Sequence, residues 1–114
     1  MAIAYLNGEW MAPAAAKVSV FDRGFMFGDG IYEVMAVYDG KVFTLEEHLV
    51  RLKRSLGAIH LESPHTDDQW RSIINVAVRR SDETPAYLYL QGTRGVESPR
   101  SHAYAGPGKP TVLI

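Results

Sequence analysis

The sequence predicts an α+β domain in which an antiparallel or mixed sheet carries two helices on one side. Three observations lead to this fold class. The dipeptides Asn7-Gly8 and Asp39-Gly40 favour tight hairpins, and each separates two short runs typical of strands. Two helical patterns follow, at residues 44–57 and 66–80. An alternating, strand-like run then returns at 87–93.

The chain is expected to begin with a hairpin. Asn7-Gly8 separates Ile3–Leu6 from Glu9–Met11, and both residues of such a turn must tolerate a positive φ. Residues 12–16 are expected to act as a connector. We expect a further short strand at Lys17–Val20, which leads into the central stretch of the chain.

The remainder of the chain is organised around residues 20–38. Two polar turns, Asp22-Arg23-Gly24 and Gly28-Asp29-Gly30, precede a strand expected at 31–38. We interpret Asp22, Arg23 and Asp29 as turn formers and structural ion pairs rather than catalytic groups. Side chains alternate between the faces of a strand. One face should therefore carry Ile31, Glu33, Met35 and Val37, and the other Tyr32, Val34, Ala36 and Tyr38.

Two helices are expected after a partner strand at Lys41–Phe43. A capping-box pattern at 44–47 should begin the first helix, which is expected to end near Gly57. A second capping box at 66–69 should begin a helix that ends near Arg80. Each helix has apolar residues at helical spacing, namely Leu45, Leu49, Leu52 and Leu56 in the first and Trp70, Ile73, Ile74 and Ala77 in the second.

The last third should consist of a strand at Tyr87–Thr93, a long loop at Arg94–Lys109 and the start of another strand at Pro110–Ile114. The 114 residues show no repeat or internal boundary, so one domain, 1–114, is expected. Because an apolar strand stands at the very end, we expect the fold to continue beyond it.

Composition excludes several classes of function. Apolar residues make up 46% of the chain and the formal net charge is −1, which gives no general attraction to nucleic acid or membranes. The absence of cysteine excludes disulfides, thiolate catalysis and thiolate metal sites. His60 and His65 have no partners at metal-ligand spacing, so no metal site is assigned. No signal peptide or membrane span is recognisable, and a cytoplasmic location is the default expectation.

His48 and Arg51 are the first candidate site residues. They are three positions apart, so they are neighbours on the surface of the first expected helix. Periodicity alone favours a plain structural interpretation, in which Arg51 pairs with Glu47 and His48 is half-buried. The alternative is an anion site, because the planar guanidinium matches the geometry of phosphate.

Arg100 and His102 are the second pair, separated by one residue in a polar loop. They are either scattered solvated charge or two donors that bind one carboxylate. Tyr32 and Val34 share a strand face, and a strand tyrosine usually packs and makes one hydrogen bond. Tyr89 on the later strand has an equally good packing interpretation.

Four segments together identify a family resemblance: residues 22–34 (DRGFMFGDGIYEV), 46–52 (EEHLVRL), 89–95 (YLQGTRG) and 98–102 (SPRSH). In this order they resemble the class IV (fold type IV) pyridoxal-phosphate aminotransferases, and most closely the D-amino acid aminotransferases. The resemblance covers the whole chain but only the small N-terminal domain of such an enzyme. It implies the fold of that domain, pyridoxal 5′-phosphate as cofactor and a homodimer whose active site is shared across the interface.

The resemblance also implies roles for individual residues. Arg51 would hold the cofactor phosphate, with His48 beside the cofactor. Tyr32, Arg100 and His102 would form a trap for the substrate carboxylate, and the loop that carries Arg100 would reach the site of the other subunit. Val34 would line the substrate pocket. The implied reaction transfers an amino group between a D-amino acid, such as D-alanine, and a 2-oxo acid; a branched-chain aminotransferase or an aminodeoxychorismate lyase is the alternative within the family.

The lysine that bonds the cofactor is expected outside this chain. None of the four lysines, at 17, 41, 53 and 109, stands in a context that resembles the family's catalytic lysine. We therefore expect residues 1–114 to be inactive alone and to expose apolar surface that favours dimerisation or aggregation. An alternative from another class is a free-standing domain that acts by binding an anion or by dimerisation.

Overall fold

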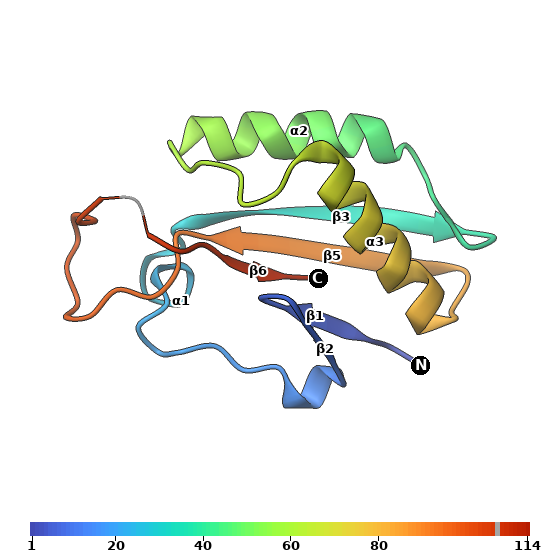
Figure 1. Ribbon diagram of the computed structural model, residues 1–114, viewed down its shortest axis with the longest axis horizontal. Coiled ribbons are helices and arrows are strands. Elements are labelled where there is room, and N and C mark those ends of the chain that lie inside the picture. The colour runs from blue at the N-terminus through green and yellow to red at the C-terminus, as the bar shows by residue number, and fades with distance from the viewer. Residues whose placement is uncertain (107) are drawn as a thin grey trace.

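A computed structural model describes residues 1–106 and 108–114, and within them six strands form one sheet in the order β2-β1-β6-β5-β3-β4 (Figure 1). Every strand pair is antiparallel. The strands are β1 (Ala4–Leu6), β2 (Glu9–Met11), β3 (Gly30–Tyr38), β4 (Lys41–Val42), β5 (Ala86–Thr93) and β6 (Thr111–Leu113). The helices are α1 (Arg23–Phe27), α2 (Leu45–Ala58) and α3 (Asp67–Ser81), with a 3-10 turn at Pro13–Ala15.

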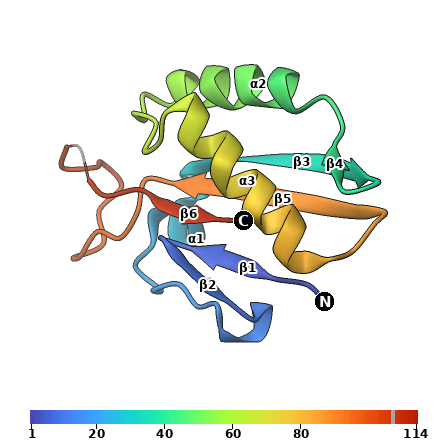
Figure 2. The ribbon, with the colours of Figure 1, turned by 45° about the vertical axis from the view of Figure 1, so that its right-hand side comes forward.

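The hydrophobic core lies between the sheet and the two long helices. Figures 1 and 2 show α2 running along β3 while α3 crosses in front of β3 and β5. Met35 of β3 and Leu90 of β5 are completely buried against Leu52 of α2 and Ile74 of α3. The predicted α+β fold, with both helices on one side of the sheet, is confirmed.

Alternation along β3 follows the prediction and gives the sheet two different faces. β3 pairs with β5 from Gly30↔Thr93 to Val37↔Ala86, which is the longest ladder among the described residues. Glu33, Met35 and Val37 are buried beneath the helices. The opposite face exposes large side chains, among them Tyr32, Val34, Tyr38, Tyr87 and Tyr89. The expected exposed apolar surface is therefore the helix-free face of the sheet.

Local chemistry explains where the helices begin and end. The capping box of α3 is confirmed, because Thr66 Oγ1 accepts from the Gln69 amide and the Gln69 side chain accepts from the Thr66 amide. The capping box predicted at the start of α2 is wrong. Thr44 adopts a left-handed φ of 54° and its hydroxyl donates to the Phe43 carbonyl instead. α2 also passes Gly57 by one residue, since His60, at a φ of 54°, provides the left-handed turn that follows the helix.

The segment before β3 differs most from the prediction. Residues 17–20 are not a strand, because Ser19 closes a turn instead: its carbonyl accepts from the Asp22 amide and its hydroxyl accepts from the Phe21 amide. Asp22 then caps α1 by accepting from the Gly24 amide, so the first polar turn is a helix start. Gly28, at a φ of 66°, ends this short helix. None of the described helices is long and apolar enough to cross a membrane.

Candidate functional site

Glu33, His48 and Arg51 form a compact charged group where α2 lies over β3. The Glu33 carboxylate is 2% exposed and accepts from Arg51 Nε at 2.9 Å and from Arg51 Nη2 at 2.9 Å. His48 Nδ1 lies 2.8 Å from the same carboxylate. Burial by itself raises the pKa of Glu33, but hydrogen bonds and charge from Arg51 and His48 outweigh burial and hold that pKa below its ordinary 4.5. Glu33 is therefore a buried anion that orients both side chains.

Arg51 pairs with a buried carboxylate while more than half of its side chain stays exposed. Its pairing with Glu47, the plain structural interpretation, is wrong, because its partner is Glu33 on the strand beneath the helix. The Arg51 side chain is 58% exposed, and within the described residues its hydrogen bonds use only Nε and Nη2. The Glu33 carboxylate also raises the pKa of Arg51, so the guanidinium stays charged. Arg51 is thus a fixed cation that faces solvent.

An open hollow of about 450 Å³ lies beside Arg51, at the edge of β3. β4 pairs only with Val37 and Tyr38, so the first half of β3 has no neighbouring strand on this side. The hollow is lined by Tyr32, Glu33, Val34, Arg51 and Ser55. A fixed cation and a tyrosine therefore border one cavity, which is an arrangement suited to an anionic ligand.

Tyr32 and Val34 lie on the exposed face of the sheet, as predicted. The Tyr32 ring stacks on Tyr89 of β5, with 5.8 Å between the centroids and an interplanar angle of 20°. The Tyr89 hydroxyl donates to the Gln91 side chain at 2.9 Å, which holds Tyr89 in place. Tyr89 therefore packs against a candidate site residue.

Arg100 and His102 come together over the ring of Phe27, the last residue of α1. Arg100 Cζ lies 4.8 Å from the ring centroid of Phe27, and the His102 ring lies 5.2 Å from it. Within residues 1–106 and 108–114, no hydrogen bond or ring contact joins Tyr32 to Arg100 or His102. One chain therefore presents two groups of candidate residues. The first lies at the edge of β3, and the second lies in the loop that packs against Phe27 of α1.

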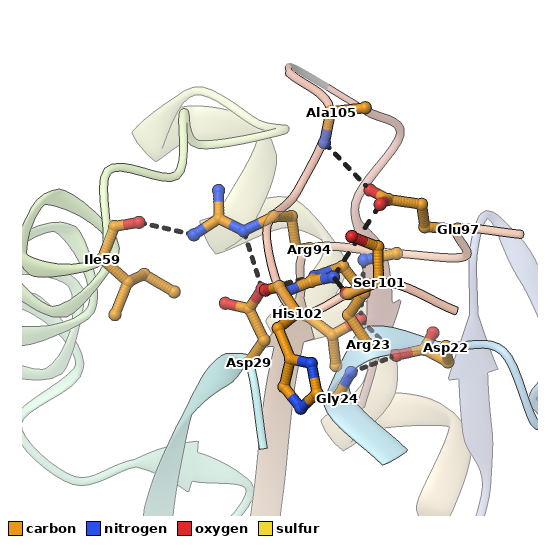
Figure 3. A network of polar contacts seen from close by, with 12 residues as sticks. Asp22, Arg23, Gly24, Asp29, Ile59, Arg94, Glu97, Ser101, His102 and Ala105 are labelled. Carbon is orange, nitrogen blue, oxygen red and sulfur yellow. Dashed lines mark hydrogen bonds and ion pairs between the residues drawn. The ribbon is translucent and has the colours of Figure 1, made fainter. Parts of the chain in front are cut away.

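A buried polar network supports the second group (Figure 3). Asp29 Oδ2 accepts from Arg23 Nε at 2.9 Å and from Arg94 Nε at 2.8 Å, and the two arginine side chains are 5% and 7% exposed. Burial raises the pKa of Asp29, but these hydrogen bonds and charges outweigh it and lower the pKa below its ordinary 3.8. The predicted structural pair of Arg23 and Asp29 is confirmed.

Sequence reasoning missed three residues of these groups: Glu33, Phe27 and Arg94. A signal was available for Glu33, because it is the one charged residue on the otherwise apolar face of β3. A carboxylate in that position needs cationic partners. Phe27 and Arg94 gave no such signal, since the contacts that bring them into these groups, Phe27 with Arg100 and Arg94 with Asp29, join residues that are far apart in the sequence.

Residues 30–114 match the family described as amino-transferase class IV, and the chain belongs to that family. It is 39% identical over 110 residues to a D-alanine aminotransferase of Staphylococcus haemolyticus, covering 96% of this chain and 39% of that protein. A hypothetical aminotransferase from Mycobacterium tuberculosis, solved in a PLP-bound form, is 30% identical with a TM-score of 0.79, covering 98% of this chain and 38% of that one.

A third similar protein is the branched-chain amino acid aminotransferase of Escherichia coli. Its TM-score is 0.86, and the match covers 98% of this chain and 38% of that one. At 23% identity this likeness shows the shared fold alone. The chain spans about 39% of the length of the curated relative.

Proposed function

We propose that residues 1–114 are the N-terminal domain of a pyridoxal-phosphate-dependent D-amino acid aminotransferase. The enzyme would exchange an amino group between a D-amino acid such as D-alanine and a 2-oxo acid. The observation that carries the proposal is the convergence of Arg100 and His102 on one ring, since a guanidinium and a neighbouring imidazole donor suit a carboxylate. Similarity to a D-alanine aminotransferase supports the choice within the family.

The residues around the β3 hollow fit the phosphate of the cofactor. Arg51 offers a charged, half-exposed guanidinium whose orientation is already set by buried Glu33. His48 Nδ1 contacts the same Glu33 carboxylate. In this proposal His48 therefore helps to fix the carboxylate that orients Arg51. When bound, pyridoxal phosphate withdraws electrons from the carbon that carries the amino group. Arg51 binds and orients that cofactor.

The substrate carboxylate would be held by Tyr32, Arg100 and His102. Because Tyr32 makes no contact with the other two within the described part of one chain, we propose that a second copy supplies the loop. The hydroxyl of Tyr32 and a ring nitrogen of His102 would donate to the carboxylate oxygens, while Arg100 would neutralise the charge of the carboxylate. Val34, 42% exposed and two residues further along the same face, would line the side-chain pocket.

The proton-transferring lysine belongs, in this proposal, to the part of the protein that the longer relatives contain and this chain does not. Residues 1–114 bind and orient: they fix phosphate at one end of the site and the substrate carboxylate at the other. Positioning of this kind lowers the barrier by holding the reacting bond near the catalytic groups.

The direct test is to express the complete gene product, load it with pyridoxal phosphate and offer D-alanine with 2-oxoglutarate. We expect pyruvate to form, and we expect Arg100→Ala to raise the KM for D-alanine. Turnover of L-leucine in place of D-alanine would favour a branched-chain aminotransferase, and pyruvate release from aminodeoxychorismate would favour the lyase. A complete protein that binds pyridoxal phosphate and turns over none of these would favour the binding-domain alternative.

A further inference from the structure

We propose that Arg23 is a positioning residue for the substrate-carboxylate site, because it holds the main chain that carries Arg100 and His102. The inference rests on the proposed function, in which those two residues bind the substrate. Arg23 itself is buried and does not reach the ligand. Its role is to set the path of the loop.

Arg23 uses its guanidinium donors on the loop and on one carboxylate. Nη1 donates to the Ser101 carbonyl at 2.6 Å and Nη2 donates to the His102 carbonyl at 2.8 Å (Figure 3). These carbonyls belong to the two peptide groups on either side of His102. Nε donates to Asp29, so this ion pair orients the guanidinium while its two terminal nitrogens bind the loop. Arg23 therefore fixes the backbone at His102 and immediately after Arg100.

The base of this contact is rigid. The Arg23 amide donates to the Gly95 carbonyl at 2.8 Å, and the Arg94 amide donates to the Asp29 carbonyl at 3.0 Å. Arg94 also donates from Nη2 to the Ile59 carbonyl at 2.6 Å, which ties the network to the end of α2. The loop is thus anchored to α1, the start of β3 and the end of β5 together.

Phe27 adds a second contact between α1 and the loop. Arg23 Cζ and Arg100 Cζ each lie 4.8 Å from its ring centroid, and the His102 ring packs on it as well. Because Arg23 and Phe27 belong to the same short helix, one element places both the loop backbone and the Arg100 side chain. A shift of α1 relative to the loop would displace both ligand-binding side chains.

The planar guanidinium is what this position requires. Three donors directed in one plane reach two carbonyls and a carboxylate at once, whereas a lysine ammonium is a single centre on a flexible stem. Arg23→Lys therefore keeps the charge beside Asp29 and loses the hold on the two carbonyls. This substitution separates positioning from simple charge balance.

The test uses the complete holoenzyme carrying Arg23→Lys, with Arg71→Lys as the matched control. Arg71 also makes two ion pairs, with Glu46 and Asp68, but it lies on α3 and has no contact with the loop that carries Arg100 among those described. We expect Arg23→Lys to raise the KM for D-alanine by about tenfold, with kcat changed less than about twofold. The reason is that displaced Arg100 and His102 side chains would bind the substrate carboxylate less well. Hydrogen exchange of residues 97–105 should become faster, while cofactor affinity stays unchanged. The control should change none of these.

A double-mutant cycle decides whether Arg23 acts through the loop residues. In the background Arg100→Ala/His102→Ala, the added Arg23→Lys should no longer raise KM. An equal increase in both backgrounds, or unchanged loop exchange in Arg23→Lys, would overturn the inference. If the Arg100→Ala/His102→Ala protein itself keeps the normal KM, the proposed carboxylate site is wrong, whatever Arg23 does.

A second variant covers the case in which Arg23→Lys does not fold. The isosteric Asp29→Asn, which weakens the hold on Arg23, must then raise the KM for D-alanine in the same way but by less. A normal KM in Asp29→Asn would overturn the inference.

Discussion

Two regions of this domain use the same chemical device, a carboxylate shared between an arginine and a second nitrogen-bearing side chain, in opposite ways. Glu33 holds Arg51 at the β3 edge, where the arginine side chain is 58% exposed. Asp29 holds Arg23 and Arg94 in the interior, where they are 5% and 7% exposed. In the first region the carboxylate is buried and the cation faces outward. In the second region both arginines are buried and the carboxylate is 16% exposed.

In the proposed function, this difference separates a ligand site from a scaffold. An arginine whose partner leaves part of the guanidinium in solvent can add an anion without losing its first ion pair. In Arg23, by contrast, each guanidinium nitrogen already donates to a carbonyl or a carboxylate and the side chain is 5% exposed, so little of it is accessible to a ligand. We therefore propose a binding role for Arg51 and an architectural role for Arg23, and substitutions at both positions test this.

Arg23→Met should have the largest effect on stability. Removing a buried guanidinium leaves two carbonyls without donors and weakens the pairing of Asp29, for which a loss of about 3–5 kcal/mol is typical. Urea unfolding monitored by circular dichroism would measure it. Arg71→Met, at an exposed ion pair, is the control and should change the free energy of unfolding little. A loss no larger than that of the control would contradict the architectural role.

Arg51→Met should show the reverse pattern. We expect the dissociation constant for pyridoxal phosphate to rise on the order of 100-fold in the complete protein, because a charge-assisted contact to phosphate is lost. The free energy of unfolding should fall much less than in Arg23→Met, since the side chain is half in solvent. Cofactor titration followed by absorbance would measure the affinity. A normal affinity would move the phosphate site elsewhere.

Glu33→Gln should have an intermediate effect on the same measurement. The amide keeps the shape of the side chain but removes the charge that orients Arg51 and the acceptor for His48. Partners that orient a ligand-binding group typically change affinity by about 10-fold to 100-fold, so we expect a value near the lower end. Equal effects of Glu33→Gln and Arg51→Met would mean that Arg51 binds only when it is pre-oriented.

Acid should weaken both regions, and this is the smallest expected effect at neutral pH. The pKa of Asp29 and that of Glu33 are lowered in the folded state from ordinary values of 3.8 and 4.5. Each therefore contributes stability that is fully present above its ordinary value and is lost as the pH falls through the lowered one. Urea unfolding between neutral pH and about pH 2 should show this decline. Asp29→Asn and Glu33→Gln should each make the free energy of unfolding depend less on pH in this range. Since the two carboxylates share no partner, the effects of the two substitutions should add.

Much of the fold could be predicted because local patterns encode it. The alternation of β3, the leucine stripe of α2 and the capping box of Thr66 and Gln69 depend on neighbours within a few residues. The predictions that failed also concern local signals, but ones that tertiary contacts overrode. The residue expected to cap α2, Thr44, is forced into a left-handed conformation between β4 and the helix. Residues 17–20 have no neighbouring strand to pair with, so a turn at Ser19 replaces the expected strand.

The sequence by itself determined the motifs that contain the candidate ligand-binding residues Tyr32, Arg51, Arg100 and His102. Only the tertiary structure decided how they are held. The Glu33 carboxylate reaches Arg51 across 18 positions, and Arg23 reaches the carbonyls of Ser101 and His102 across 78 and 79. Such pairings depend on which strand lies under which helix and on where a long loop returns. No local pattern encodes that, because hydrogen bonds between distant segments exist only once the sheet has brought those segments together.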